Sequence, residues 1–223
     1  ESNTTASNNT AVGLDALTAN TTGAGNVAVG TNALDANPTA NNNTAVGADA
    51  LSAATTGHSN TAVGKEAGEA LTTGVSTVFI GSGAGKAVTV TGSSNEHDGT
   101  VGIGYNALTA LTSGQSNVAI GRSALLACAA SDANVAIGDN ALAGLNGTGS
   151  GGNTAVGYRA GISVEGGTFN TILGNSALYN NSAGDWNVAI GYAALYRTST
   201  SDTYGKNVAV GTEAGFNNGT GVD

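Results

Sequence analysis

The stretch Asn26-Val27-Ala28-Val29-Gly30-Thr31-Asn32-Ala33-Leu34 decides the fold, because close copies of it recur along the whole chain. There are twelve copies, each with a glycine at the position of Gly30 and an alanine at the position of Ala33. The glycines are Gly13, Gly30, Gly47, Gly64, Gly81, Gly104, Gly121, Gly138, Gly157, Gly174, Gly191 and Gly211. The interval from Gly13 to Gly30 recurs in eight of the eleven steps, and only three steps are longer. A short fixed period of this kind predicts a stacked repeat architecture.

Each copy opens with residues typical of a short β-strand. The residue before the glycine is Val, Ile or Leu, and the residue three positions before it is Thr or Val. This alternation places β-branched residues on one face of a strand and a small residue, usually Ala, on the other. The glycine supplies a corner that a residue without a Cβ adopts easily. We expect each coil to consist of a strand, a glycine corner, a short second strand and a polar turn.

Stacking such coils predicts an all-β protein, a parallel β-solenoid (β-roll) of about twelve 17-residue coils. Residues 9–215 form the repeat domain, residues 1–8 a polar lead-in and residues 216–223 a C-terminal tail. A 17-residue coil is too thin to bury both its Val/Ile column and its Leu column, so one apolar stripe needs a partner. Two further copies around a threefold axis would cover it, which predicts a homotrimeric rod. The alternative is a self-contained solenoid with one apolar side.

Four residues of the seventh copy represent the positions that hold such a rod together: Ile120, Gly121, Ala124 and Leu125. The alanine column is invariant, which indicates an interior where nothing larger fits. Ten copies also begin with Asn. This Asn column predicts a ladder of amides that hydrogen-bond from coil to coil, and a row of ligand contacts is the less favoured interpretation.

Charge and composition exclude several classes of partner. The net charge is −9, and the six Lys and Arg residues are scattered, so we expect no nucleic-acid groove. No apolar run approaches the length of about 20 residues that a membrane-spanning helix needs, so we expect no membrane span. The single cysteine, Cys128, has no partner within the chain for a disulfide.

Catalytic chemistry has little support in the sequence. The two histidines, His58 and His97, lie in different repeats. Glu96-His97-Asp98 could bind a metal, but without a second His or Cys nearby a solvated loop is the favoured interpretation. Cys128 has no base adjacent in sequence. We therefore predict no enzyme activity, no catalytic residues, no cofactor and no metal site.

The aromatic residues offer a more specific hypothesis. Of the ten aromatic residues, eight follow residue 150. Tyr179 and Tyr196 occupy the same position in successive coils, so their rings should stack about one strand spacing apart. Trp186 lies in the turn between those coils. These three are our receptor-binding candidates, and a stiffer cap at the end of the solenoid is the alternative.

The phrases Asn26-Val27-Ala28-Val29-Gly30, Asn117-Val118-Ala119-Ile120-Gly121 and Asn187-Val188-Ala189-Ile190-Gly191 resemble the head repeats of trimeric autotransporter adhesins. They are also similar to repeats in bacteriophage tail fibres and in related surface proteins. The resemblance implies a trimeric, left-handed parallel β-roll and a role in attachment. The chain departs from the adhesin heads in its 17-residue coil and in the Ala-Leu pair after the corner.

Together these observations predict an extracellular fibre or adhesin segment, on a virion or a bacterial surface. It would bind a host or surface glycan or protein receptor. One alternative is a subunit of a self-assembling extracellular filament. Another is an ice-binding β-solenoid, although the irregular mixture of Thr and Val three residues before each glycine argues against a regular Thr array.

We expect Ile120→Asp or Ala124→Phe to prevent assembly, because each places an unsuitable side chain in a packed column. Size-exclusion chromatography and thermal denaturation would measure the outcome. A normally assembled, heat-stable variant would contradict this packing scheme.

Overall fold

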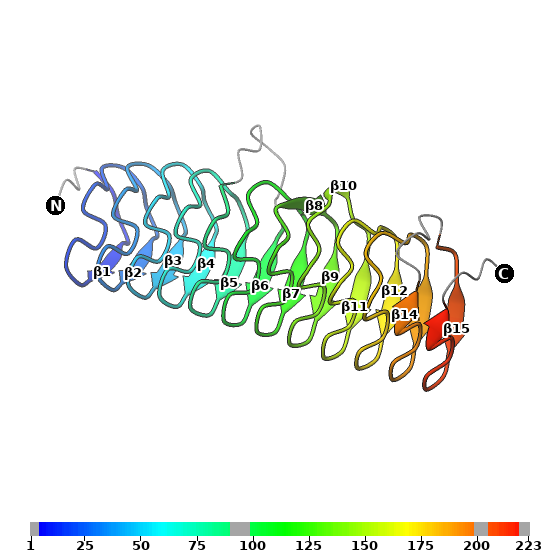
Figure 1. The fold of residues 1–223 in the computed structure, drawn as a ribbon. Helices are drawn as coiled ribbons and strands as arrows, with labels where there is room; N and C mark the ends of the chain where they lie inside the picture. Colours follow the sequence, from blue (N-terminus) through cyan, green and yellow to red (C-terminus); the bar gives the residue numbers. More distant parts are fainter. Residues whose placement is uncertain (1–4, 90–98, 199–204, 219–223) are drawn as a thin grey trace. The chain divides into compact units, whose positions relative to one another are not determined.

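The computed structural model describes residues 5–89, 99–198 and 205–218. It divides into two compact units, Glu1–Ser113 and Gly114–Asp223. Within each unit the chain winds through successive coils, and each coil contributes one short strand to a sheet (Figure 1). The described residues form strands and turns but no helix. The predicted fold class, an all-β parallel β-solenoid of 17-residue coils, is confirmed.

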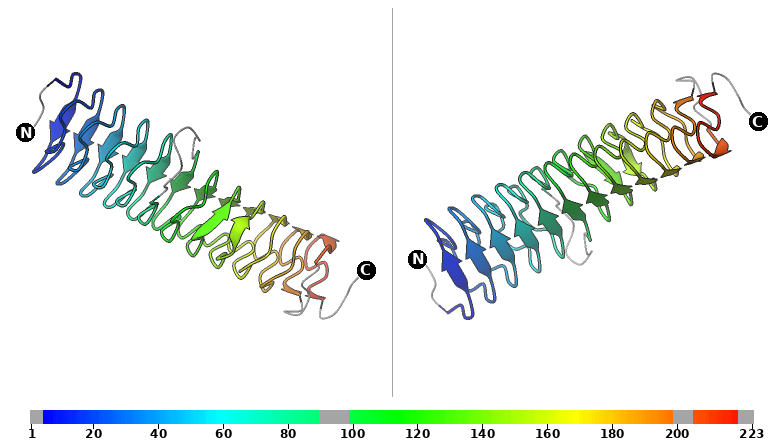
Figure 2. Two further views of the ribbon diagram at one scale, coloured as in Figure 1. Left: turned by 90° about the horizontal axis from the view of Figure 1, so that it is seen from above. Right: turned by 90° about the horizontal axis from the view of Figure 1, so that it is seen from below.

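In the first unit each strand pairs in register with the strand of the next coil. Thr44 pairs with Thr61, for example, and Val46 with Val63. Figure 2 shows the strands of this unit side by side and pointing in the same direction. In order across the sheet they are β1 (Thr10–Val12), β2 (Val27–Val29), β3 (Thr44–Val46), β4 (Thr61–Val63), β5 (Val78–Ile80) and β6 (Val101–Ile103).

The second unit repeats this arrangement and adds two short parallel ladders. Its main strands, in order, are β7 (Val118–Ile120), β9 (Val135–Ile137), β11 (Thr154–Val156), β12 (Thr171–Leu173), β13 (Val188–Ile190) and β15 (Val208–Val210). The additional pairs are β8 (Ala130–Asp132) with β10 (Thr148–Ser150), and β14 (Arg197–Thr198) with β16 (Asn217–Asn218). Both additional ladders lie outside the main sheet: β8, β10 and β14 come from segments between its strands, and β16 follows its last strand, β15.

The three longer steps leave the strand register intact. β5 and β6 pair in register although the step between their glycines is the longest of the eleven. β9 pairs in the same way with β11, and β13 with β15, across the other two longer steps. The additional residues therefore do not shift the pairing of the strands.

The alanine face of each strand is the inner one. Ala28, Ala119 and Ala189 at the centre of their strands have no exposed surface. The β-branched residues on either side, such as Val118 and Ile120, are only half-buried. The Val/Ile stripe that we expected to need a partner thus lies on the outer face of the sheet in both units.

The interior is completed by the residues three, four and seven positions after the corner glycine, each of which forms a column along the stacked coils. In the seventh coil they are Ala124, Leu125 and Cys128, all fully buried. The uniform smallness of the first column is explained by this burial, since its alanines lie inside the coil. The third column, which also contains Leu71 and Leu111, was not singled out from the sequence because its residue type varies between coils.

The predicted second strand is wrong for the regular coils. The residues after the corner form consecutive turns, in which the N–H of Ala33 donates to the carbonyl of Gly30 and the N–H of Asn37 to that of Leu34. Between them, the N–H of Leu34 donates to Ala50 in the next coil. Some backbone N–H groups of this segment thus bond within their own coil, and others bond to the next coil. The segment consists of turns instead of a second strand, but it still links adjacent coils by hydrogen bonds.

These turns place a leucine in the left-handed region of the backbone. All eight leucines that follow the invariant alanine have a positive φ, for example 57° at Leu108 and 52° at Leu125. The left-handed conformation costs a residue with a Cβ about 1–2 kcal/mol. Full burial of a leucine side chain contributes about 1.5–3 kcal/mol, which offsets that cost. The four coils with Gly at this position avoid the strain but lose the side chain.

One coil compensates for that loss with a larger strand residue. Phe79 stands where most strands have Ala, and its ring is fully buried. A Cβ added to Gly85 would lie 2.5 Å from the ring, and one added to Gly68 would lie 3.1 Å from it. Both glycines occupy the leucine column, so the phenyl ring fills the space of two absent leucine side chains. Gly102, the neighbouring strand residue, also makes room for the ring, since a Cβ added there would lie 3.1 Å from it.

The asparagine column is a buried ladder, as predicted. In the second unit, Asn170 Oδ1 accepts the backbone N–H of Asn187 at 2.9 Å and its side-chain amide at 3.0 Å. Asn170 Nδ2 donates to the carbonyl of Gly184 at 3.0 Å. In the first unit, Asn43 likewise accepts from the backbone of Asn60. The amides satisfy backbone groups inside the coil, and their burial leaves them no surface for a ligand.

Replacing Asn170 with Ala should lower the free energy of unfolding by about 2–4 kcal/mol, because the buried N–H of Asn187 would lose its acceptor. Urea denaturation followed by circular dichroism measures this change. Asn175→Ala is the matched control, since Asn175 is exposed in the same coil and should change stability by less than about 0.5 kcal/mol. Equal effects of the two substitutions would contradict a structural role for the ladder.

Candidate binding site

The predicted stacking of Tyr179 on Tyr196 is confirmed, and the stack includes a third ring. The ring centroids of Tyr179 and Tyr196 are 4.8 Å apart, and those of Tyr196 and Phe216 are 4.9 Å apart. All three rings are half-buried, and their residues have ordinary negative φ values. This stack occupies the position five residues after the corner glycine. Phe216 was missed from the sequence because the last step, from Gly191 to Gly211, is longer than the regular one.

Trp186 belongs to a different stack. Its ring lies on that of Phe169, with centroids 4.4 Å apart and planes inclined by 19°. Both side chains are exposed, Phe169 by 42% and Trp186 by 54%. They lie five residues before their corner glycines, in the turn that leads into the strand. Phe169 was not among the sequence candidates, although its separation from Trp186 by one regular coil is the signal that would have found it.

Both aromatic residues of this pair are in the left-handed region of the backbone, with φ of 57° for Phe169 and 61° for Trp186. In every other coil this position also has a positive φ, and its residue is small or polar. Those residues are Asn8, Gly25, Asn42, Ser59, Ser76, Gly99, Ser116, Ala133, Gly152 and Lys206. A bulky aromatic ring is an outlier at such a φ.

The contact between the two rings does not by itself offset the backbone strain of this pair. A non-glycine residue in a sparsely populated backbone region costs about 1–3 kcal/mol. An aromatic stack contributes about 0.5–1.5 kcal/mol beyond the surface it buries, and each of these rings leaves about half of its surface exposed. A strained pair with this much exposed aromatic surface is a candidate functional site.

The outer face of the sheet is a second candidate surface. Val63, Ile80, Ile137 and Leu173 along it are each more than a third exposed. Aromatic side chains stand at both ends of β13, with Trp186 before the strand and the exposed Tyr192 after it, and the same holds for no other single strand among the described residues. The exposed apolar surface at β13 thus extends beyond the strand in both directions.

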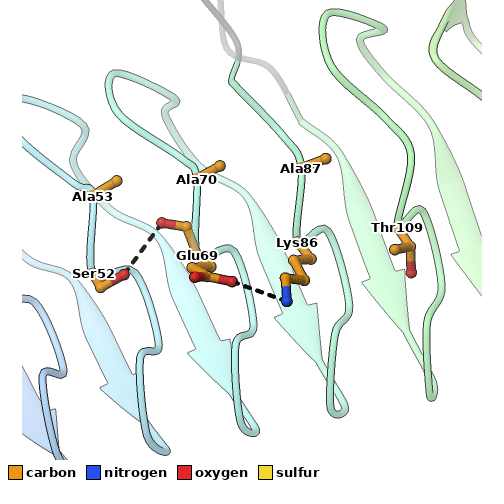
Figure 3. A pocket seen from close by; sticks show the side chains of 7 residues that line it. All are labelled: Ser52, Ala53, Glu69, Ala70, Lys86, Ala87 and Thr109. Carbon is orange, nitrogen blue, oxygen red and sulfur yellow. Dashed lines mark hydrogen bonds and ion pairs between the residues drawn. The ribbon is translucent and has the colours of Figure 1, made fainter.

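A shallow groove lies on the first unit, five and six residues after the corner glycines. It has a volume of about 450 Å³ and a floor of alanines, with a row of polar side chains beside them (Figure 3). Lys86 Nζ lies 3.3 Å from Glu69 Oε2 and 2.7 Å from Glu66 Oε2. The lysine is thus held by two carboxylates. The groove offers no second basic group for an anionic ligand.

Glu66 is the most strongly paired carboxyl group in this cluster. Hydrogen bonds from Lys65 and Lys86 lower the pKa of Glu66 from 4.5 to about 2. The same interactions raise the pKa of Lys65 and of Lys86. These reciprocal shifts indicate an ion-pair network that links two coils, not a carboxyl group prepared for proton transfer.

The remaining reactive groups are poorly placed for catalysis. Cys128 is buried, its Sγ contacts the carbonyl of Ser131 at 3.7 Å, and burial raises the pKa of its thiol to about 11. His58 is exposed, and its ring contacts Ser59. Within the described ranges no group of three or more His, Cys, Asp or Glu side chains could hold a metal ion. The Glu96-His97-Asp98 cluster lies outside the described residues.

The comparisons with known proteins leave this chain without an assigned family. No family model matches it, and no curated protein or solved structure is significantly similar to it. In the part of the chain that the structure describes, no helix has the length and apolar character needed to traverse a bilayer.

Acidification should destabilise the protein partly through Glu66. Its carboxyl group has a lower pKa when folded than when unfolded, so its stabilising contribution is complete above about pH 4.5 and is lost as the pH falls toward 2. Glu66→Gln should therefore reduce the drop in thermal midpoint between pH 6 and pH 3, measured by circular dichroism. Glu165→Gln is the control, because Glu165 is exposed and has no ion pair among the described residues. If both variants keep the full acid-induced drop, the Glu66 network does not contribute.

Proposed function

We propose that the chain is a non-enzymatic segment of an extracellular fibre or surface adhesin that attaches a virion or a bacterial cell to a host or other surface. In this role it assembles as a homotrimer. The observation that carries the proposal is the outward-facing column of Val, Ile and Leu on the sheet of each unit. This column is apolar surface that the fold of the single chain leaves exposed, as is expected of a surface that packs against another chain.

The size of this face supports an interface. Six three-residue strands, about 4.8 Å apart and about 10 Å long, give one unit a face of roughly 300 Å². Exposed apolar patches of a few hundred Å² commonly mark interaction sites. Identical chains that share the same face are the simplest partners, and closed symmetry prevents unlimited growth. The resemblance of the repeats to trimeric adhesin heads and tail fibres favours a threefold axis.

The attachment role is supported by the positions at which the residue type varies from coil to coil. The interior columns hardly change from coil to coil, whereas the turns differ in charge, size and aromatic content. A rigid, repetitive body with variable turns can present receptor contacts at fixed spacings. The exposed aromatic residues of the second unit, Trp186 among them, are the best candidates for these contacts.

Ice binding is the second candidate function. Thr44 and Thr61 face outward in neighbouring strands of the first unit, as Thr154 and Thr171 do in the second. Regular outward rows of Thr and β-branched residues on a flat sheet are what such a function requires. A thermal-hysteresis assay on the purified chain tests it directly. Measurable hysteresis by a monomer would replace the fibre proposal.

The decisive measurement is the absolute mass in solution, by light scattering on a size-exclusion column. The proposal requires a species of about three times the 21.3 kDa chain mass. A monomer would contradict the trimeric interface. A mass that rises continuously with concentration would favour the self-assembling filament instead.

A pair of aspartate substitutions in one coil tests the interface. Ile120 lies on the outer face, so Ile120→Asp should yield a monomer with an unchanged circular dichroism spectrum. Ser123→Asp is the matched control, because other coils carry Asp at this turn position, and it should remain trimeric. Ala124 is fully buried, so Ala124→Phe should lower the free energy of unfolding by about 1–3 kcal/mol or more. A trimeric Ile120→Asp variant would exclude this face as the interface.

A further inference from the structure

We propose that Phe169 and Trp186 form a binding site for a neutral sugar ring, which stacks on the indole face that Phe169 leaves free. This inference rests on the attachment role proposed above and names its ligand class. It also separates this pair from Tyr179 and Tyr196, whose half-buried and unstrained stack has the properties of a structural ladder.

The stack has a closed end and an open end. Phe169 lies against the backbone of Gly152, where an added Cβ would be 2.7 Å from the ring. Trp186 covers the other face of Phe169. In the next coil the same position holds Lys206, so no third ring follows. The Trp186 side chain is 54% exposed, so part of the indole is accessible to a ligand.

The charged residues next to the stack are Asp185 and Lys206. Asp185 precedes Trp186, and its Oδ1 accepts the backbone N–H of Thr168 at 2.7 Å and its hydroxyl at 3.1 Å, so this carboxylate is bonded to the coil of Phe169. Lys206 is exposed, and the described residues give it no ion pair. Its backbone N–H donates to the carbonyl of Asp185 at 2.9 Å, so Lys206 is the charged residue of the coil that follows Trp186, and its ammonium can donate to hydroxyls.

This combination favours a neutral pyranose over other ligands. The apolar C–H face of a sugar stacks on an aromatic ring, and each hydroxyl both donates and accepts hydrogen bonds. A purely apolar ligand would offer the Lys206 ammonium no hydrogen-bond partner. An anionic ligand would approach a chain of net charge −9.

The strain at both ring positions supports the same inference. Asn42, in the same column with a φ of 58°, is a residue type that tolerates the left-handed region. A coil therefore has no structural need for Phe169 or Trp186 where it could carry Asn. Retaining two rings at this cost is expected if the rings contact a ligand.

The experiment uses Trp186, the only tryptophan in the chain: its emission, excited selectively over that of the six tyrosines, reports this site alone. An array of neutral and acidic glycans would identify a binding glycan, and the corresponding free oligosaccharide would then be titrated against the wild-type protein. We expect a neutral glycan that shifts or quenches the Trp186 emission with saturation. No bound glycan, or acidic glycans only, would overturn the proposal.

Two variants separate binding from folding. Trp186→Asn should abolish glycan binding on the array, with at least a tenfold loss, while the thermal midpoint stays the same or rises. Phe169→Asn should weaken binding with the same effect on stability. Tyr196→Leu, in the other stack, should bind like wild type. Unchanged binding by Trp186→Asn, or a thermal midpoint that falls more than that of Tyr196→Leu, would show that the pair is structural.

These outcomes are independent of the oligomeric state. Light scattering on the same variants reports the trimer, because Trp186 lies outside the Val/Ile column of the proposed interface. A trimer without glycan binding would overturn this inference and leave the fibre proposal standing. A monomer that binds a neutral glycan through Trp186 would overturn the trimeric interface and leave this inference standing.

Discussion

Hydrogen bonding between equivalent residues of successive coils is the constraint on which this structure depends. Backbone groups of one coil pair with those of the next in strands and in turns alike. At the corner the approach is so close that a Cβ on Gly121 would lie 2.5 Å from the carbonyl oxygen of Gly138. This corner favours glycine for two reasons: a Cβ would collide with the next coil, and residues with a Cβ rarely adopt its φ of 133°. A constant coil length is the consequence, because residues added to one coil must lie outside this pairing.

Once the coils are aligned, each sequence position becomes a column of like side chains. Each residue of an interior column must fit against the equivalent residues of the two adjacent coils. The alanines are therefore uniformly small, and the asparagine side chains hydrogen-bond to the backbone of the next coil. Deviations are compensated locally. Phe79 fills the space beside Gly68 and Gly85, and Ile172 similarly lies close to Gly161. The interior therefore tolerates exchange of volume between adjacent coils, provided the total stays constant.

Columns that lie outside carry no such restriction, and the two units use them differently. In the first unit Glu66, Glu69 and Lys86 form an ion-pair network beside an alanine-floored groove. In the second unit the position that Glu69 and Lys86 occupy in their coils, five residues after the corner glycine, holds the stacked rings of Tyr179, Tyr196 and Phe216. The pair of Phe169 and Trp186 differs from both, because its rings are exposed on a strained backbone. That combination of cost and exposure distinguishes a candidate binding site from a ladder that stabilises the end of the chain.

The sequence by itself determined the parallel β-solenoid, the period, the glycine corners and the stacking of Tyr179 on Tyr196, because identical spacing forces identical environments. Periodicity could not decide which face of the strand is inner, since Ala and Val are both compatible with burial and only the closed coil sets the available volume. It also misjudged the residues after the corner, where leucines such as Leu125 adopt a left-handed conformation that their residue type disfavours and that burial offsets. The role of Phe169 depended on the tertiary structure for a related reason. Exposure and backbone strain arise from the stacked coils, and neither is encoded in the identity of a single residue.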